Sequence, residues 1–472
     1  MKTSAYILFM WKIYCLMLCI VFSILTAGGK HTPGQTAPLL GFTPFPYSLS
    51  QIDSSQQFVY SKIASDANII AHHFDDGIPW NEAYSNSEFP SSIVYDWNVR
   101  KSKTPAGHKI YVAVTPINLA RTGLALYKNT SGGDQPLSSP WDTVSFSHPI
   151  VKTAFLNYCK AVITQLQPDY LAIGIEVNLL KINSPQKWDS YAELHSFVYT
   201  ELKVLFPTLP IFVSFTGFDL AGYTSADRVE QMKVLSDMMP VSDYLGLSLH
   251  PQLSSFMTND IPPMEVLDSI LSMNLKPVAV CETSYPAQYS TLYGGSITLN
   301  GTQAKQSQYF MNLFVSCEKR KTEFIINFVV RDYDQLWQDI GSPDDLTVLW
   351  RDTGFYDEWG IPRDVLQVWK PKVTSVADKM NEKYSLDYRL AQNYPNPFNP
   401  TTTISYTLSA DEHVALSVYS VLGTEIVVLV DEQQPAGNYS VKFNGTTLPG
   451  GVYFYTLNAE KKSYTRKMLL LK

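Results

Sequence analysis

Residues 277–286 read PVAVCETSYP, an apolar run of strand length that ends in a carboxylate and hydroxyl-bearing residues. Seven further runs of this kind occur between residues 39 and 332. Segments with apolar residues at three-to-four spacing lie between the runs and predict helices, as at 151–166 and 191–206. The other runs are LLGFTPFPY (39–47), NIIAHHFDD (68–76), KIYVAVTPI (109–117), YLAIGIEVN (170–178), PIFVSFTG (210–217), YLGLSLHPQ (244–252) and FIINFVVRD (324–332).

Strands that alternate with helices predict a parallel sheet. Eight such units over about 300 residues fit a closed (β/α)8 TIM barrel better than an open sheet. No G-x-G-x-x-G or G-K-S/T loop follows any run, which weakens the alternative of an open nucleotide-binding sheet. We therefore predict an α/β barrel over 33–372, closed by a short helix within 352–370 that starts near Pro362.

The composition agrees with a large folded domain. Of 472 residues, 45% are hydrophobic and 17% charged, which provides a core and excludes a disordered chain. The net charge is −7, and no long basic run occurs. Because binding to phosphate backbones needs clustered positive charge, we expect no nucleic-acid partner.

The N-terminus predicts a signal peptide over residues 1–28. Lys2 and Lys12 precede an apolar run at 13–25, and small residues follow at 27–29. A membrane anchor is the alternative, but the run is shorter than the roughly 20 residues that span a bilayer. No other long apolar segment follows, so we predict no integral membrane segment in the mature chain.

The cysteines predict neither a lipid anchor nor a disulfide scaffold. A lipidation site at Cys19 would need a small residue before it, and Leu18 stands there. The predicted mature chain keeps three cysteines without metal-type spacing, so at most one bridge can form. These are Cys159, Cys281 and Cys317.

The C-terminal part changes character twice. Residues 373–389 show little periodic hydrophobicity and predict a linker, and a cluster of Pro and Asn follows in YPNPFNPTT (394–402). Beyond it, alternating apolar runs between Gly, Pro and Asn turns predict a small all-β, immunoglobulin-like sandwich over 390–472.

This region resembles the type A sorting domain carried by cargo of the type IX secretion system. The resemblance rests on LAQNYPNPFNPTTTISYTL, VALSVYSVLGTEIVVLV, PAGNYSVKFNGTTLPGGVYFYTL and the terminal TRKMLLLK, in that order. It implies export across the outer membrane by that machinery through residues 390–472, then removal of the domain and surface attachment or release. A plain carbohydrate-binding or adhesive sandwich is the alternative.

Two carboxylates stand where a barrel carries its chemistry, at the carboxyl ends of strands. Glu176 ends the fourth run and Glu282 the seventh, each after apolar residues. Burying a carboxylate costs free energy unless it is paired, so the placement of both glutamates requires an explanation. Glycoside hydrolysis needs two carboxyl groups flanking one bond. The alternative is that each is a structural ion-pair partner inside the barrel.

The barrel resembles the retaining glycoside hydrolase clan with its acid/base on strand four and its nucleophile on strand seven, and within it the family 53 endo-β-1,4-galactanases. The resemblance rests on SDYLGLSLHPQL (242–253) and KPVAVCETSYPA (276–287). It implies that Glu282 is the nucleophile, that Glu176 is the acid/base and that His250 orients the nucleophile. It also implies a polysaccharide substrate and no cofactor.

The chain departs from the clan's pattern in three places. Ile175 stands directly before Glu176, where the clan usually has Asn, and Asn178 comes two residues after it. The eighth run offers Phe328 where a Trp often stands, with Trp337 later, and the family 53 signature of strand three is missing. A non-catalytic glycan-binding or structural surface barrel therefore stays open as the alternative.

The second run ends in several polar and aromatic residues. Neighbours on a strand point to opposite faces, so they could not all converge on one ion, and we predict no metal site. We expect instead a substrate rim, in which His73 and Asp76 bind sugar hydroxyls and Trp80 offers an apolar face. Asn178, His250, Tyr285 and Trp337 complete the expected substrate-binding set; the alternative is ordinary packing.

A serine esterase is set aside. No G-x-S-x-G motif occurs, and Ser214, Ser248 and Ser284 show no His partner in the sequence.

Overall fold

The structure is a computed structural model that describes residues 37–256, 261–292, 295–341 and 348–377, and most of 389–472. The predicted signal peptide lies outside the described residues, as does 378–388 of the predicted linker. The chain divides into two compact units between Ala377 and Asp378. Each unit is described by itself.

The first unit contains a closed barrel of eight parallel strands in the order β1-β12-β9-β8-β7-β6-β3-β2. Every strand falls inside one of the eight predicted runs, so the predicted TIM barrel is confirmed. The strands are β1 (Leu39–Phe42), β2 (Ile69–Phe74), β3 (Lys109–Val114), β6 (Tyr170–Ala172), β7 (Ile211–Thr216), β8 (Leu245–Leu249), β9 (Val278–Thr283) and β12 (Phe324–Asn327).

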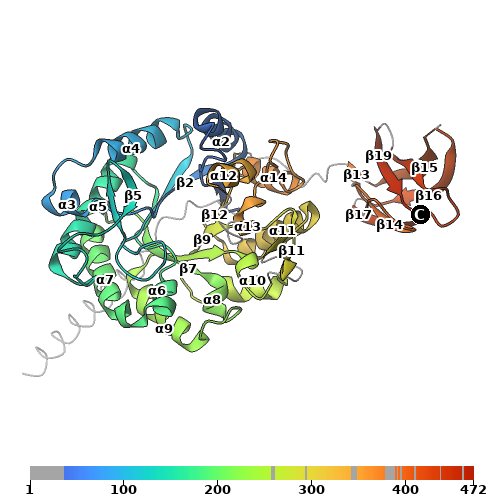
Figure 1. The fold of residues 1–472 in the computed structure, drawn as a ribbon. Helices are drawn as coiled ribbons and strands as arrows, with labels where there is room; N and C mark the ends of the chain where they lie inside the picture. The colour runs from blue at the N-terminus through green and yellow to red at the C-terminus, as the bar shows by residue number, and fades with distance from the viewer. Residues whose placement is uncertain are drawn as a thin grey trace, which may run out of the picture. The chain divides into compact units, whose positions relative to one another are not determined.

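Helices encircle the strands (Figure 1). The helices predicted at 151–166 and 191–206 are α5 and α7, and the closing helix α14 starts a few residues after Pro362. The described helices of this unit are α2 (Ile52–Asp66), α3 (Trp80–Ser85), α4 (Ser91–Lys103), α5 (Pro149–Leu166), α6 (Asn178–Asn183), η1 (Pro185–Lys187), α7 (Trp188–Leu205), α8 (Gly217–Ala221), α9 (Arg228–Met238), η2 (Met239–Val241), η3 (Pro251–Leu253), α10 (Met264–Leu271), α11 (Gln303–Arg320), α12 (Asp334–Asp339), α13 (Val348–Arg351) and α14 (Val365–Ala377).

Side chains fill the inside of the barrel. The ring of Tyr111 lies 5.0 Å from that of Phe324 and 5.9 Å from that of Phe212, and all three are fully buried. Gly246 has to be glycine here, because a Cβ would lie 2.5 Å from the Val213 carbonyl oxygen. The barrel therefore has a solid aromatic floor beneath its mouth.

Two hairpins extend the loops at the carboxyl ends of the strands. One, β4 (Tyr127–Asn129) with β5 (Gly132–Gln135), follows β3, and the other, β10 (Tyr289–Leu292) with β11 (Ile297–Asn300), follows β9. Within the described ranges, no helix is long and apolar enough to cross a membrane.

The second unit is a small antiparallel β domain, as predicted. Its two sheets have the orders β13-β14-β17 and β16-β15-β18-β19 and bury a common core that includes Ile404, Leu416 and Tyr455. The strands are β13 (Arg389–Leu390), β14 (Thr401–Leu408), β15 (Glu412–Ser420), β16 (Glu425–Gln434), β17 (Gly437–Asn444), β18 (Gly451–Ala459) and β19 (Lys462–Leu470).

Candidate active site

Glu282 reaches the barrel mouth through an irregularity in β9. Ala279 and Cys281 belong to the inner core of the barrel, so strict alternation would turn Glu282 outward. On β8, Leu247 pairs with Val280 and the next residue pairs with Glu282, so β9 contains one extra residue. A bulge of this kind re-aims the following side chain. The Glu282 carboxylate is thereby held 14% exposed between two histidines.

The surroundings of Glu282 favour its ionised form. His73 Nδ1 lies 3.5 Å from one carboxylate oxygen and His250 Nε2 lies 3.5 Å from the other. Burial alone would raise the pKa of Glu282, but the contact with His250 and the proximity of His73 and Arg121 outweigh it and lower this pKa. An ionised carboxylate at neutral pH is the form that a nucleophile requires.

Glu176 reaches the mouth by a different backbone device. Ile175 packs into the inner core of the barrel, and Glu176 follows with φ of 50°, in the left-handed region that side chains seldom adopt. Its backbone N–H donates to Ser214 Oγ at 3.0 Å, and its carboxylate lies 3.5 Å from Arg121 Nη2. Ser214 thus anchors the turn that presents Glu176 to Arg121.

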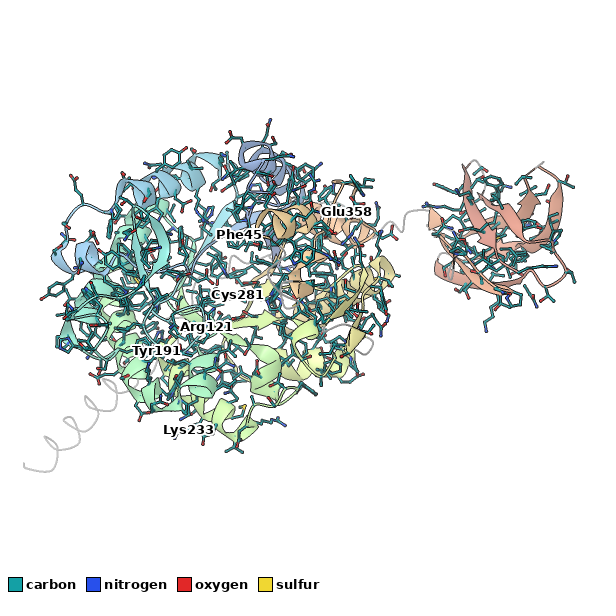
Figure 2. The ribbon with its side chains drawn as sticks, in the orientation of Figure 1. Phe45, Arg121, Tyr191, Lys233, Cys281 and Glu358 are labelled. Carbon is teal, nitrogen blue, oxygen red and sulfur yellow. The ribbon has the colours of Figure 1, made fainter. Side chains whose placement is uncertain are left out.

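Arg121 and Tyr111 link the two carboxylates. Arg121 pairs with Glu176, and its charge also helps to lower the pKa of Glu282. Burial raises the pKa of Tyr111, and the negative charges of Glu282 and Glu176 raise it further. Figure 2 shows Arg121 and Cys281, the neighbour of Glu282, near the centre of the barrel in projection. Both carboxylates therefore lie near the same two side chains, Arg121 and Tyr111.

Aromatic residues form a wall beside Glu282. Phe328 follows β12, and its ring lies 5.9, 5.4 and 5.7 Å from those of Phe45, Trp350 and Tyr333. The Trp350 ring is 4.7 Å from that of His250, and burial and the charge of Glu282 raise the pKa of Tyr333. We call Phe45, Phe328, Tyr333 and Trp350 the aromatic wall; all four are partly exposed.

The expected rim at strand two is only partly at the site. His73 points to Glu282, whereas its neighbour His72 points away from the barrel interior and contacts Thr104 Oγ1 at 3.1 Å. Asp76 forms an ion pair with Lys128 at 2.7 Å. Trp80 is fully buried, because its indole N–H donates to the Ala125 carbonyl and its ring stacks on Trp141. A ring buried in this way offers no face to a ligand.

Three other expected residues have packing partners within the fold. Asn178 is fully buried and bonds Thr216 and Gln231, which fastens α6 to its neighbours. Tyr285 is 5% exposed and stacks on Tyr309. Trp337 packs against an apolar cluster that includes Leu292 and Leu299 of the β10–β11 hairpin. Of the sequence-derived candidates, the structure brings Glu176, Glu282, His73 and His250 together around the mouth.

Ser284 does have a histidine partner, contrary to expectation. Its Oγ lies 2.9 Å from His250 Nδ1, because β8 and β9 are adjacent strands. Ser284 is fully buried, so it cannot attack a bound ester. Trp350 and Tyr333 were missed by sequence reasoning; their only signal was aromatic residues in the long loop after the eighth strand.

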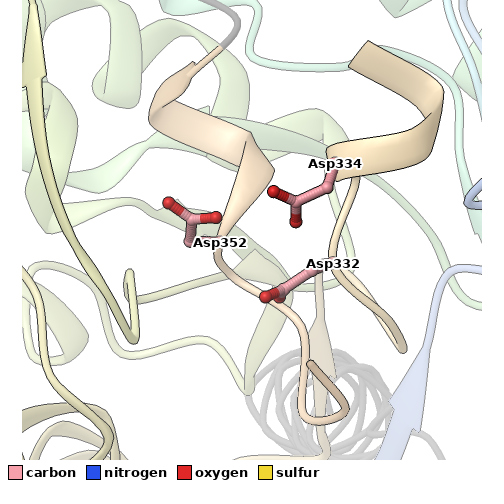
Figure 3. A group of neighbouring side chains, drawn as sticks. All are labelled: Asp332, Asp334 and Asp352. Atoms are coloured by element: carbon pink, nitrogen blue, oxygen red, sulfur yellow. The ribbon is translucent and has the colours of Figure 1, made fainter. Parts of the chain in front are cut away.

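Three aspartates gather in that loop (Figure 3). Oxygens of Asp332, Asp334 and Asp352 lie within 4.8 Å of one another. Arg363 pairs with Asp332, while Arg351 contacts Asp352 at 2.9 Å and Asp334 at 3.7 Å. Since two guanidinium groups already balance most of this charge, we assign the cluster to holding the loop in place.

The C-terminal unit matches a known family. Residues 392–471 match the model described as the secretion system C-terminal sorting domain. This domain indicates secretion through the type IX system to the cell surface or the extracellular space. No curated protein matches the chain.

The chain is similar to solved structures of low sequence identity. They include the β-glucuronidase of Bacteroides uniformis, at 11% identity and a TM-score of 0.52, covering 93% of this chain and 46% of that one. The exo-β-1,4-mannosidase of Opitutaceae bacterium strain TAV5 matches at 13% identity and a TM-score of 0.52, covering 79% and 67%. The chain spans about half the length of the β-glucuronidase. At these identities the likeness establishes the fold.

Proposed function

We propose that this chain is a secreted glycoside hydrolase that cleaves β-glycosidic bonds of a polysaccharide by a retaining mechanism. The observation that carries the proposal is the pair Glu176 and Glu282 at the carboxyl ends of β6 and β9, each re-aimed by an irregular backbone and both acted on by Arg121. The likeness of the fold to a β-glucuronidase and an exo-β-1,4-mannosidase supports the proposal.

The two carboxylates take different roles. Glu282, kept ionised by its histidines, attacks the anomeric carbon, while Glu176 protonates the leaving oxygen. The bond from carbon to Glu282 forms as the glycosidic bond breaks, and the new hydroxyl leaves with the proton. Glu176 then removes a proton from water, which attacks the same carbon and releases Glu282.

Sugar recognition falls to groups around the carboxylates. His73 Nε2 and Arg121 Nε are buried and have no hydrogen-bond partner in the described part of the chain. We assign them to sugar hydroxyls, in place of the amide that Ile175 does not supply. The aromatic wall stacks on the apolar face of a pyranose ring.

The test is chemical trapping of Glu282. The full chain is first assayed on a panel of galactan, mannan, xylan and glucan, with β-1,4-galactan as the family 53-like expectation. An activated 2-fluoro glycoside of the cleaved sugar is then added. We expect a glycosyl adduct on the peptide carrying Glu282, identified by mass spectrometry. An adduct elsewhere, or inversion at the anomeric carbon, would overturn the mechanism.

A glycan-binding barrel without turnover is the second candidate, and Ile175 beside Glu176 is the observation that favours it. The same panel separates the two candidates. Tight binding of a β-glycan that the protein never cleaves would establish this alternative and exclude the enzymatic function.

Export by the type IX machinery through residues 390–472 has its own test. Deleting this segment should leave the protein in the periplasm, as measured by cell fractionation. Normal surface delivery of the truncated chain would contradict this role.

A further inference from the structure

We propose that Gln252 and Ser284 position His250 so that its Nε2 carries a proton directed at Glu282. This inference rests on the proposed function for its catalytic meaning, although its geometry does not. It concerns two residues that do not themselves touch the nucleophile.

The three side chains form a buried line of contacts. Gln252 Nε2 lies 2.6 Å from Ser284 Oγ, and Ser284 Oγ lies 2.9 Å from His250 Nδ1. His250 Nε2 then lies 3.5 Å from Glu282 Oε1. Ser284 is fully buried, and Gln252 and His250 are 2% and 5% exposed.

Counting donors and acceptors sets the direction of these bonds. An amide nitrogen can only donate, so Ser284 Oγ accepts a hydrogen bond from Gln252. The serine has one proton to donate, and its remaining partner among the described residues is His250 Nδ1. His250 Nδ1 is therefore the acceptor. A neutral imidazole that accepts at Nδ1 carries its proton on Nε2.

This tautomer directs an N–H at Glu282. The opposite tautomer would place a nitrogen lone pair against the carboxylate, which is repulsive. The ring of Trp350 meets that of His250 edge-on, at 4.7 Å and 87°, and so restricts its rotation. His250 Nε2 has no closer partner in the described part of the chain, and its proton is thus reserved for Glu282.

Gln252 determines the direction of the hydrogen bonds between these side chains. Its Oε1 is buried without a hydrogen-bond partner among the described residues, and a group that only accepts at this position would reverse every bond. Gln252→Glu puts a carboxylate there, which would take the Ser284 proton and leave His250 to donate from Nδ1. Gln252→Met fills similar space without donating or accepting, so it is the matched control for size.

The experiment reads the tautomer directly. Full-length protein labelled with 15N at histidine is examined by NMR at neutral pH, and the His250 signals are identified by their loss in His250→Gln. We expect the Nε2–H form in the wild type, a mixture in Ser284→Ala and the Nδ1–H form in Gln252→Glu. Gln252→Met should give a mixture. The Nδ1–H form in the wild type, or no change in Ser284→Ala, would overturn the proposal.

Kinetics give the second readout. Ser284→Ala should lower kcat by about tenfold, as expected for the loss of one hydrogen bond, with KM within about twofold. Ser284→Thr keeps the hydroxyl and should restore most of the rate. Ser316→Ala, at a buried serine of α11, should change neither the tautomer nor the rate.

The two measurements separate the possible failures. If the protein cleaves no glycan but shows the expected tautomers, the proposed function fails and the positioning role stands. If it cleaves a glycan with unchanged tautomer and kcat in Ser284→Ala, the positioning role fails alone.

Discussion

The ends of β6 and β9 solve the same geometric problem in different ways. At each strand end the polar side chain has to face the mouth although the residue before it already points inward. In β9 an extra residue restores the direction for Glu282, and after β6 the left-handed conformation of Glu176 does so. The comparison teaches that a carboxylate at the end of an apolar run can be delivered by more than one backbone device.

The two ends also differ in their electrostatic surroundings. Glu282 lies between two imidazoles, whereas Glu176 faces one guanidinium and is anchored through its own backbone. Exposure of the two carboxylates is similar, at 14% and 19%, so solvent access does not distinguish them. The neighbours distinguish them, and the predictions below test this difference.

The largest expected effect is at Glu282, the proposed nucleophile. Glu282→Gln should lower kcat by roughly 10⁴-fold or more on every substrate, because no covalent intermediate can form. Glu176→Gln should be comparably slow on the polysaccharide but nearly normal in the first step on aryl glycosides, whose leaving groups need no proton. Burst kinetics on both substrates measure this, and equal losses on both would abolish the distinction.

Removing the shared cation should have an intermediate effect. Arg121→Met takes away the charge beside Glu176 and one of the charges that lower the pKa of Glu282. We expect kcat/KM on the polysaccharide to fall by about 10- to 100-fold, corresponding to a loss of roughly 1.5–3 kcal/mol. Arg100→Met, which breaks an ion pair with Asp96, is the control. An unchanged kcat/KM would show that the two strand ends act independently.

We expect His73 to help determine the pH below which activity is lost. A lowered pKa keeps Glu282 ionised below the usual glutamate range, and activity falls as pH drops through that pKa. His73→Ala removes one lowering charge, so the acidic limb of the kcat/KM profile should move up by about one pH unit. His72→Ala, one residue away and directed to the other face, should leave the limb in place. A shift in both variants would point to general disruption of β2.

The smallest effect concerns the backbone alone. Since left-handed conformation is costly for residues with a side chain, Glu176→Gly should unfold with a free energy roughly 1 kcal/mol higher than Glu176→Ala. At Glu282, where no left-handed conformation is involved, glycine should be the less stable of the pair by roughly 0.5–1 kcal/mol. Urea denaturation measures both pairs. The same order at both positions would mean that the two backbone devices do not differ energetically.

The fold was readable from the sequence because each barrel strand is a short apolar run between helical segments. The two carboxylates could be picked out because a charged residue directly after an apolar run is costly to bury unless it has a partner or a function. The extra residue in β9 could not be predicted from the sequence, since an apolar run looks the same with or without a bulge. Alternation alone would have turned Glu282 away from the mouth.

The neighbours of the carboxylates were harder to predict. Trp80 and Asn178 are of types that suit a sugar site, but the folded chain satisfies both internally. Trp350 meets His250 edge-on although they are 100 positions apart in the chain, and no local pattern marks such a contact. Ser284 and His250 are 34 positions apart in the chain and likewise meet only because β8 and β9 are adjacent.

The aromatic floor of Tyr111, Phe212 and Phe324 has a consequence for a polymer. A barrel plugged in this way is open at one end only, so a long chain cannot thread through it. For the proposed polysaccharide hydrolase, substrate would enter and product would leave through this same opening. A small molecule bound in this opening would therefore block substrate entry and product release together.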